Sequence, residues 1–180
     1  MPVPQPRWIT LAAAAAFAVL AASSGRAQSK MEISTGAFAP GGQIPAKYTC
    51  SGDNISPMLT IRGVPPSAKA LVLIVDDPDA PAGTFVHWVF YNLPPQTSQI
   101  EAGIKPDATL AEGGVQGRND FGRAGYGGPC PPPGAPHHYR FRLFAVSSQI
   151  APESSTGSAV EQAMQGRVVA NAVMVGTFQR

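Results

Sequence analysis

The stretch Lys69–Leu93, "KALVLIVDDPDAPAGTFVHWVFYNL", decides the fold. Its first nine residues form a continuous apolar run, partly β-branched, which predicts a central β-strand buried on both faces. A second strand is predicted from Thr84 to Leu93, where Pro94 and Pro95 end it. The connection between the two strands is rich in acids and prolines, which suits either a surface turn or one wall of a site.

The rest of the chain repeats this alternation of apolar runs and turn residues. Further strands are predicted at Met31–Phe38, Met58–Val64 and His138–Ser147, and part of Val168–Phe178 also has a strand pattern. Glycine and proline number 19 each, and only 13% of residues are charged, which indicates many turns and little helix. The segment from 96 to 136 is mostly loop, and loops of this length are usually functional.

One helix is predicted, at Thr156–Arg167, with Ser155 or Thr156 as its cap. Its apolar face is formed by Val160, Ala163 and Met164. We see no internal repeat and no linker that would divide the chain after its N-terminal segment. We therefore expect one mainly β domain, a sandwich of two antiparallel sheets with one or two short peripheral helices.

The first 27 residues have the layout of a secretory signal peptide. Arg7 precedes an apolar stretch of 14 residues, and small residues follow up to Ala27. This stretch is shorter than the roughly 20 residues of a membrane span, which favours cleavage after Ala27 over an uncleaved anchor. We expect a mature domain of residues 28–180 in the periplasm or outside the cell, without an integral membrane span.

Charge and cysteine content narrow the function further. Without Arg7 and Arg26 the chain has 11 basic and 11 acidic residues and no charge run, which argues against a nucleic-acid partner. Cys50 and Cys130 are the two cysteines, and an even pair in an exported protein predicts a disulfide bond. Two buried free thiols are the alternative.

The three histidines fall in two places, each directly after a loop rich in glycine or proline. Strand alternation places His87 on one face with Phe85, Val89 and Tyr91, and places Val86, Trp88 and Phe90 on the other. In the later strand His137 shares a face with Tyr139, Phe141 and Leu143, opposite Arg140 and Arg142. If both apolar stripes face one core, His87 and His137 lie together at one end of it.

Several chemistries could use such a cluster. A metal site is not favoured, because no histidine pair has a metal-ligand spacing, and no Gly-x-Ser-x-Gly elbow indicates a serine hydrolase. An acid–base pair of Asp77 and His87 stays open as an alternative. The residues better suit a small anion pocket, in which histidine, tyrosine and backbone N–H groups donate and an aspartate orients a histidine. Ordinary histidines at the edge of the core are the remaining alternative.

Several ordered motifs resemble the phosphatidylethanolamine-binding protein family, also called Raf kinase inhibitor-like proteins, and above all its bacterial branch. They are "DPDAP" followed by "HW", then "CSGDNISP" at 50–57, "NDFGRAGYGGP" at 119–129 and "GYGGPCPPPGAPHHYRF". The resemblance covers roughly Met31 to Arg180. It implies a two-sheet sandwich with a pocket for phosphate-type groups and the phosphoethanolamine head group. The residues it assigns to ligand binding are Asp77, Asp79, His87, Gly128, Pro129, His137 and Tyr139.

Within this pocket the resemblance implies that His87, His137 and Tyr139 donate to the ligand and that Asp77 orients a histidine. The loop of Gly128 adds backbone donors, and Asp76 is a bystander. Three positions depart from the common pattern of the family: Ile61 stands where a tryptophan is frequent, Pro136 precedes the histidine, and His138 replaces an arginine.

We therefore expect an exported, non-catalytic binding or regulatory protein without metal or cofactor, whose ligand is a small anion or phospho-head-group. One alternative is an acid–base hydrolase that uses Asp77 and His87. Another is an interaction module that inhibits a protease or a kinase-like partner. The family also allows a homodimer.

Overall fold

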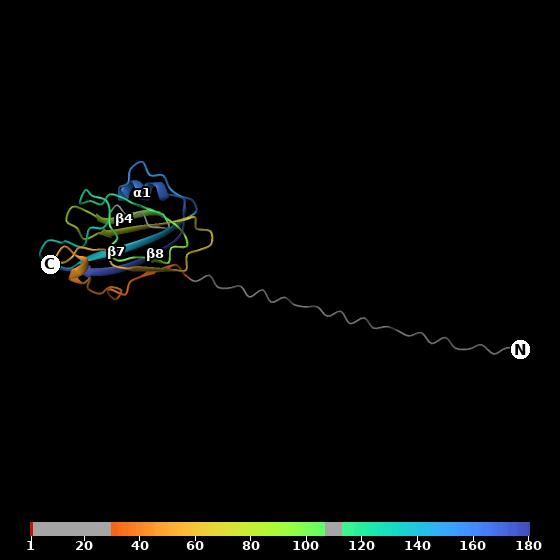
Figure 1. Ribbon diagram of the computed structural model, residues 1–180, viewed down its shortest axis with the longest axis horizontal. Helices are drawn as coiled ribbons and strands as arrows, with labels where there is room; N and C mark the ends of the chain where they lie inside the picture. Colours follow the sequence, from red (N-terminus) through yellow and green to blue (C-terminus); the bar gives the residue numbers. More distant parts are fainter. Residues whose placement is uncertain (2–29, 107–112) are drawn as a thin grey trace.

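The computed structural model describes Met1, residues 30–106 and residues 113–180. Two antiparallel β-sheets pack face to face, and one α-helix covers part of the outer face of the larger sheet (Figure 1). The expected mainly β sandwich is confirmed. The expected signal peptide lies outside the described residues, apart from Met1. Within the described part of the chain, no helix has the length and apolar character needed to span a membrane.

The larger sheet has five strands in the order β6-β4-β3-β7-β8. These strands are β3 Ala70–Asp77, β4 Phe85–Leu93, β6 Val115–Gln116, β7 His137–Val146 and β8 Val168–Phe178. The smaller sheet has the order β1-β2-β5, formed by β1 Glu32–Ser34, β2 Leu59–Arg62 and β5 Gln99–Ile100. The helix is α1 Gly157–Met164, and η1 Ala46–Tyr48 is a single 3-10 turn.

Strand β3 is the centre of the fold. All eight of its residues are buried, as its apolar run predicts, because β4 and β7 flank it and both of its faces are covered. Strand β8 is continuous over its whole predicted range, whereas β1 and β2 are shorter than predicted. The short strands β5 and β6 lie within the segment that was predicted to be mostly loop.

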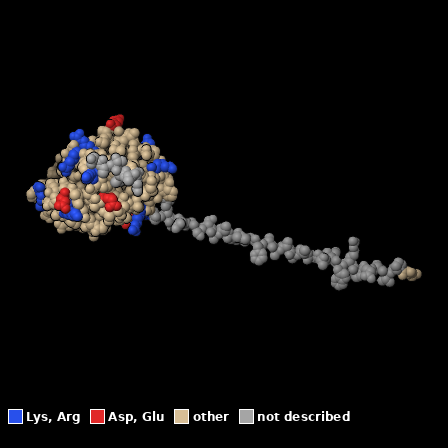
Figure 2. Space-filling model, in the orientation of Figure 1, with Lys and Arg blue, Asp and Glu red and all other residues tan. Residues whose placement is uncertain are grey.

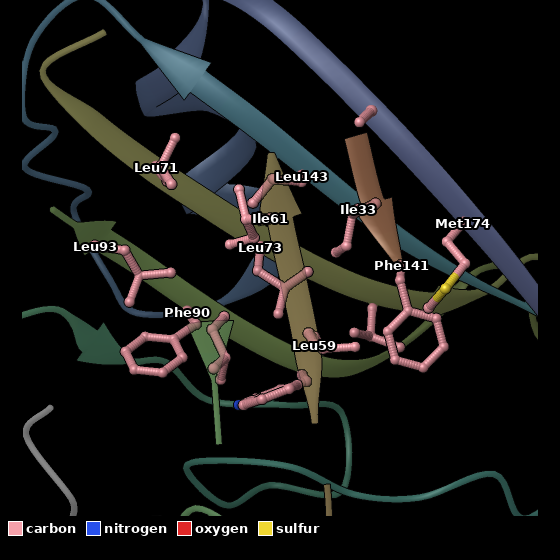
Figure 3. Packing of buried hydrophobic residues seen from close by; sticks show 14 of the residues in the cluster. Ile33, Leu59, Ile61, Leu71, Leu73, Phe90, Leu93, Phe141, Leu143 and Met174 are labelled. Atoms are coloured by element: carbon pink, nitrogen blue, oxygen red, sulfur yellow. The ribbon is translucent and has the colours of Figure 1, made fainter. Parts of the chain in front are cut away.

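The main hydrophobic core lies between the two sheets (Figure 3). From the smaller sheet, the side chains of Ile33, Leu59 and Ile61 face the larger sheet. From the larger sheet, the labelled core residues are Leu71, Leu73, Phe90, Leu93, Phe141, Leu143 and Met174. A second cluster on the opposite face of the large sheet packs Val72, Ile74 and Val89 against Val160 and Met164 of α1. Full burial of each such side chain contributes about 1.5–3 kcal/mol.

A β-bulge in β4 changes the expected facing of its residues. Val75 pairs with Trp88 but Asp76 pairs with Val86, so His87 is an extra residue in β4. The ring of His87 lies 5.2 Å from that of Tyr139, on the face of the sheet where Trp88 and Phe90 join the main core. Val86 lies on the opposite face, where it packs with Val89 and Tyr91 toward α1. The prediction that His87 shares a face with Val89 and Tyr91 was therefore wrong, because strict alternation holds only without a bulge.

Asp76 is part of a buried ion pair and not a bystander to the structure. Its carboxylate is fully buried and accepts hydrogen bonds from Arg140 Nε at 2.7 Å and Nη2 at 3.0 Å. The guanidinium of Arg142 lies 2.6 Å from the same carboxylate and also pairs with Glu161 of α1. These contacts connect β3, β7 and the helix on the side of the sheet opposite to the main core.

The boundaries of α1 follow local capping chemistry. Thr156, rather than Ser155, is the N-cap, since its hydroxyl accepts a hydrogen bond from the N–H of Ala159. The helix ends at Met164, and Gly166 then adopts a positive φ of 72° that permits the chain to turn into β8. Figure 2 shows that the visible surface is largely uncharged, with acidic and basic groups scattered over it.

Candidate functional site

A small pocket lies at the end of the sandwich where β3 ends and where β4 and β7 begin. Its volume is about 160 Å³. The residues that line it are Asp77, Ala80, Pro81, Phe85, His87, Phe121, Cys130, Pro131, Pro132 and His137. Drug-sized ligands occupy pockets of roughly 300–1,000 Å³, so this pocket suits a small chemical group.

Asp77 and His137 form a buried pair at one wall of the pocket. The Nδ1 atom of His137 lies 2.7 Å from Asp77 Oδ2. The other carboxylate oxygen of Asp77 accepts the backbone N–H of Asp79 at 2.8 Å, in a turn typical of aspartate. Both carboxylate oxygens are thus fixed, and they fix the ring of His137. Nε2 is then the remaining polar atom of this ring.

His87 occupies another wall of the same pocket and has a separate partner. Its Nδ1–H donates to the backbone carbonyl of Gly127 at 2.7 Å. Burial lowers the pKa of His87, and the Gly127 carbonyl and the Asp77 carboxylate offset this only in part. The imidazole is therefore neutral at pH 7 in the free protein, with Nε2 as its acceptor atom. Asp77 and His87 line the same pocket, but the hydrogen bond of Asp77 goes to His137, and Asp77 acts on His87 through its charge.

Tyr139 lies behind His87 and does not line the pocket. Its ring is nearly perpendicular to the His87 ring, and the residue is fully buried. Burial, together with the nearby Asp77 carboxylate, raises the pKa of Tyr139, so the phenol stays protonated. Its hydroxyl interacts with the Asp77 carboxylate, although this contact lacks the geometry of a full hydrogen bond. Tyr139 therefore interacts with Asp77 and is not one of the residues that line the pocket.

Asp79 is at the rim and holds the loop that follows β3. Its Oδ2 atom accepts the backbone N–H of His138 at 2.8 Å and lies 2.7 Å from His138 Nδ1. These hydrogen bonds lower the pKa of Asp79. Asp79 therefore positions the loop that carries Ala80 and Pro81, and is not itself one of the pocket-lining residues.

Gly128 and Pro129 shape the opposite loop. A Cβ atom on Gly128 would lie 2.4 Å from the carbonyl oxygen of Tyr48, so only glycine fits. The N–H of Gly128 donates to Asn54 Oδ1 at 2.7 Å, so it is not the free backbone donor that the sequence led us to expect. The carbonyl of Pro129 accepts the N–H of Cys50 at 3.0 Å. The predicted disulfide between Cys50 and Cys130 is present and joins the same two segments.

The apolar walls of the pocket were missed from the sequence. The ring of Phe121 lies 4.8 Å from that of Phe85 and 5.4 Å from that of His87. Pro131 and Pro132 complete this side. The three polar groups Asp77, His87 and His137 therefore meet at an apolar opening, and no lysine or arginine is among its described lining residues. The clusters "DAPAG" and "PCPPP" were the available signal, since rigid prolines beside histidines favour a fixed wall.

Comparisons with known proteins agree with this architecture. The family model described as phosphatidylethanolamine-binding protein matches residues 34–179. The UPF0098 protein of Methanothermobacter thermautotrophicus is 45% identical over 152 residues, which are 83% of this chain and 99% of that protein. The YbcL protein of Escherichia coli is 38% identical over 154 residues, 82% of this chain and 84% of that protein.

Two crystal structures have a similar fold. That of Escherichia coli YbcL, described as a new member of the mammalian PEBP family, has a TM-score of 0.79 at 34% identity and covers 84% of this chain and 99% of YbcL. That of a phosphatidylethanolamine-binding protein homologue of Chlamydia trachomatis has a TM-score of 0.76 at 39% identity, with 84% and 98% of the two chains covered. Sequence, fold and the arrangement of motifs agree, and this chain belongs to the phosphatidylethanolamine-binding protein family.

Proposed function

We propose that this protein is a non-catalytic binding protein that holds a small anion, either phosphate or the phospho-head-group of a larger molecule, in the pocket of Asp77, His87 and His137. The observation that carries the proposal is that the two histidine rings are held in the same way. Each uses Nδ1 for a fixed hydrogen bond, to Asp77 or to the Gly127 carbonyl, and each keeps Nε2 for a ligand. Protonated imidazoles so oriented donate to phosphate or carboxylate oxygens.

The pocket takes its ligand together with a proton. In the free protein His87 is neutral, and the Asp77 carboxylate is the one formal negative charge among the lining residues. A dianion would meet this like charge in a pocket whose lining residues include no lysine or arginine. Binding of a monoanion, or uptake of a proton by His87 as the anion enters, gives Nε2 a hydrogen to donate. The ligand and the proton therefore favour each other.

We further propose that the protein acts outside the cytoplasm, in the periplasm or after secretion. The disulfide between Cys50 and Cys130 suits an oxidising compartment. The N-terminal sequence, with its short apolar stretch and small residues before Ala27, supports the same location. The partner is then an anion or phospho-head-group of that compartment, free or carried by a protein.

Isothermal titration of the purified protein with inorganic phosphate and with phosphoethanolamine tests the proposal. We expect binding by the wild type at pH 6, and at least a tenfold weaker affinity for His87→Ala, because the variant loses one of the two donors. Lys69→Ala is the control, because Lys69 is exposed and lies just before β3, at the end of that strand opposite to Asp77 and the pocket. Absence of binding by the wild type, or equal affinities of wild type and His87→Ala, would refute an anion site here.

The same variant separates binding from catalysis. If the site is an acid–base hydrolase, the wild type hydrolyses a phosphoester or ester and His87→Ala loses that turnover. We expect no turnover by either protein, because the described pocket residues include no serine or free thiol as a nucleophile.

A further inference from the structure

The residues that follow β8 lie beside the candidate pocket. Strand β8 ends at Phe178, which pairs with His137 of β7, so the chain leaves the large sheet at its pocket end. Gln179 is held there, because its Nε2–H donates to the Gly134 carbonyl at 2.6 Å. Gly134 belongs to the proline-rich loop before His137, and this loop supplies one wall of the pocket. The next residue, Arg180, is therefore delivered to the edge of the pocket.

Arg180 places a guanidinium at this edge. Its Nη1 atom lies 3.8 Å from the Sγ atom of Cys130, which is one of the pocket-lining residues. Sulfur is a weak acceptor and a guanidinium has five N–H donors, so this contact leaves most of the donors for other partners. Among the described residues, the arginines in ion pairs are Arg140 and Arg142, whereas Arg180 is exposed and pairs with no described carboxylate.

Arg123 also lies near the pocket, but its guanidinium is placed on an aromatic ring. It lies 5.5 Å from the ring centre of Phe121, a distance typical of a cation–π contact. Within the described part of the chain, Arg180 has no such ring contact. Arg180 is therefore the better placed of these two arginines to meet an anion that enters the pocket.

The two histidines of the pocket can satisfy only two oxygens of a ligand. The Nδ1 atom of His87 is used by the Gly127 carbonyl, and that of His137 is used by Asp77. Each ring thus keeps only Nε2 for a ligand. Two such donors match a carboxylate or a phosphate diester, which each have two oxygens that share the negative charge. Inorganic phosphate and phosphate monoesters have at least one oxygen more, and a guanidinium is well suited to bind it.

We propose that Arg180 is a ligand-binding residue that makes the pocket selective for inorganic phosphate and phosphate monoesters over phosphate diesters and carboxylates. This inference rests on the proposed anion site, because Arg180 takes the oxygen that His87 and His137 leave. Its guanidinium also supplies a positive charge opposite to that of the Asp77 carboxylate, which no lysine or arginine among the lining residues does. A pocket of about 160 Å³ holds the phosphoryl group alone, so the substituent of a monoester extends into solvent.

Isothermal titration at pH 6 with four probes tests the role of Arg180. The probes are inorganic phosphate, phosphoethanolamine as a monoester, glycerophosphoethanolamine as a diester, and acetate. We expect Arg180→Gln to weaken the binding of phosphate and phosphoethanolamine by about tenfold or more, and that of the diester and acetate by less than about twofold. Arg180→Lys should recover part of the loss, because it keeps the charge but not the planar pair of donors.

Arg167→Gln is the charge-matched control. Arg167 is exposed and directly precedes β8, at the end of that strand opposite to Phe178 and the pocket, so all four affinities should stay within about twofold of the wild type. Because Arg180 is exposed as well, thermal unfolding of Arg180→Gln should match that of the wild type, which separates a lost contact from a lost fold.

The outcomes separate this inference from the anion site on which it rests. Unchanged phosphate affinity in Arg180→Gln, or an equal loss for all four probes, would overturn the selectivity assigned to Arg180 and leave the site in place. A wild type that binds none of the probes would refute the site itself. If the variant shows the expected selective loss, tighter wild-type binding of phosphoethanolamine than of phosphate supports a head-group as the ligand, and the reverse order supports free phosphate.

Discussion

Two neighbouring aspartates at the end of β3 have different roles, one at the pocket and one in a structural ion pair, although they belong to one acidic cluster in the sequence. Asp77 points to the pocket and fixes His137, while Asp76 points to the other face of the sheet and is fully buried beside Arg140 and Arg142. An acid next to an apolar run, with two arginines on the outer face of a later strand, was the available signal for this ion pair. The strand alternation that separates Asp76 from Asp77 is the physical reason for the division.

Replacement of Asp76 by asparagine should destabilise the fold. The change keeps the shape but removes the charge that two arginines share, and loss of one partner of a buried pair costs about 3–5 kcal/mol. Because both arginines are partly exposed, we expect a decrease of about 2–3 kcal/mol in the free energy of unfolding. Urea titration measures it, with the exposed Asp53→Asn as the control. Equal midpoints for the two variants would contradict a structural role of Asp76.

At the scale of elements, the sequence predicts those strands whose apolar pattern is long. Strands β3, β4, β7 and β8 appear where expected, and the helix ends close to its predicted bounds. Strands β5 and β6 have only two residues each, which is too short for an alternating apolar pattern. They form because they pair with β2 and β4, respectively. The bulge at His87 is set by the pairing of β4 with β3, which no local pattern in β4 reveals.

The same limit applies to the site. The motifs "DPDAP" and "HHY" identify Asp77 and His137, and His87 follows from its place on the next strand. Phe85 and Phe121, by contrast, have the composition of any core residue, and only the fold shows that they line an opening. Free backbone donors were expected at Gly128 because a glycine-rich loop often supplies them, yet Asn54 takes the N–H of Gly128.

The disulfide should support stability more than binding. It joins residues 80 positions apart, and removal of such a bond costs about 2–5 kcal/mol. The pocket loop keeps its noncovalent anchors, since the N–H of Cys50 still reaches the Pro129 carbonyl and that of Gly128 reaches Asn54. We therefore expect Cys50→Ala/Cys130→Ala to melt at a lower temperature and, although Cys130 is one of the pocket-lining residues, to lose less phosphate affinity than His87→Ala does. Loss of binding in a folded variant would make the disulfide part of the site.

At the scale of the whole molecule, stability and ligand affinity should respond to acid in opposite directions. The pKa of His87 is lower in the folded protein than in the unfolded chain, so the unfolded state binds more protons between the two values. The stability that neutral His87 contributes is complete above about pH 6.5 and is lost as pH falls through the folded pKa. An anion bound beside His87 favours the protonated ring, so phosphate should bind more tightly in the same range.

Thermal unfolding at pH 5.5 and pH 8, with and without phosphate, measures both effects. The free protein should melt lower at pH 5.5, and the increase in melting temperature caused by phosphate should be larger there. In His87→Gln both differences should shrink, because the titrating group is gone. A phosphate effect independent of pH in the wild type would mean that no proton accompanies the ligand.

The order of the large sheet also has a consequence for how fast the protein folds. The central strand β3 pairs with β4, which follows it directly in the sequence, but its other neighbour in the sheet is β7. The hydrogen bonds between Asp76 of β3 and Arg140 of β7 join residues 64 positions apart. A ribosome must therefore deliver most of the chain before β3 gains its second partner. Topologies with such distant contacts fold in milliseconds to seconds. The nascent chain thus has a long interval without a completed sheet, in which the apolar side chains of β3 have neither their second strand partner nor a closed core.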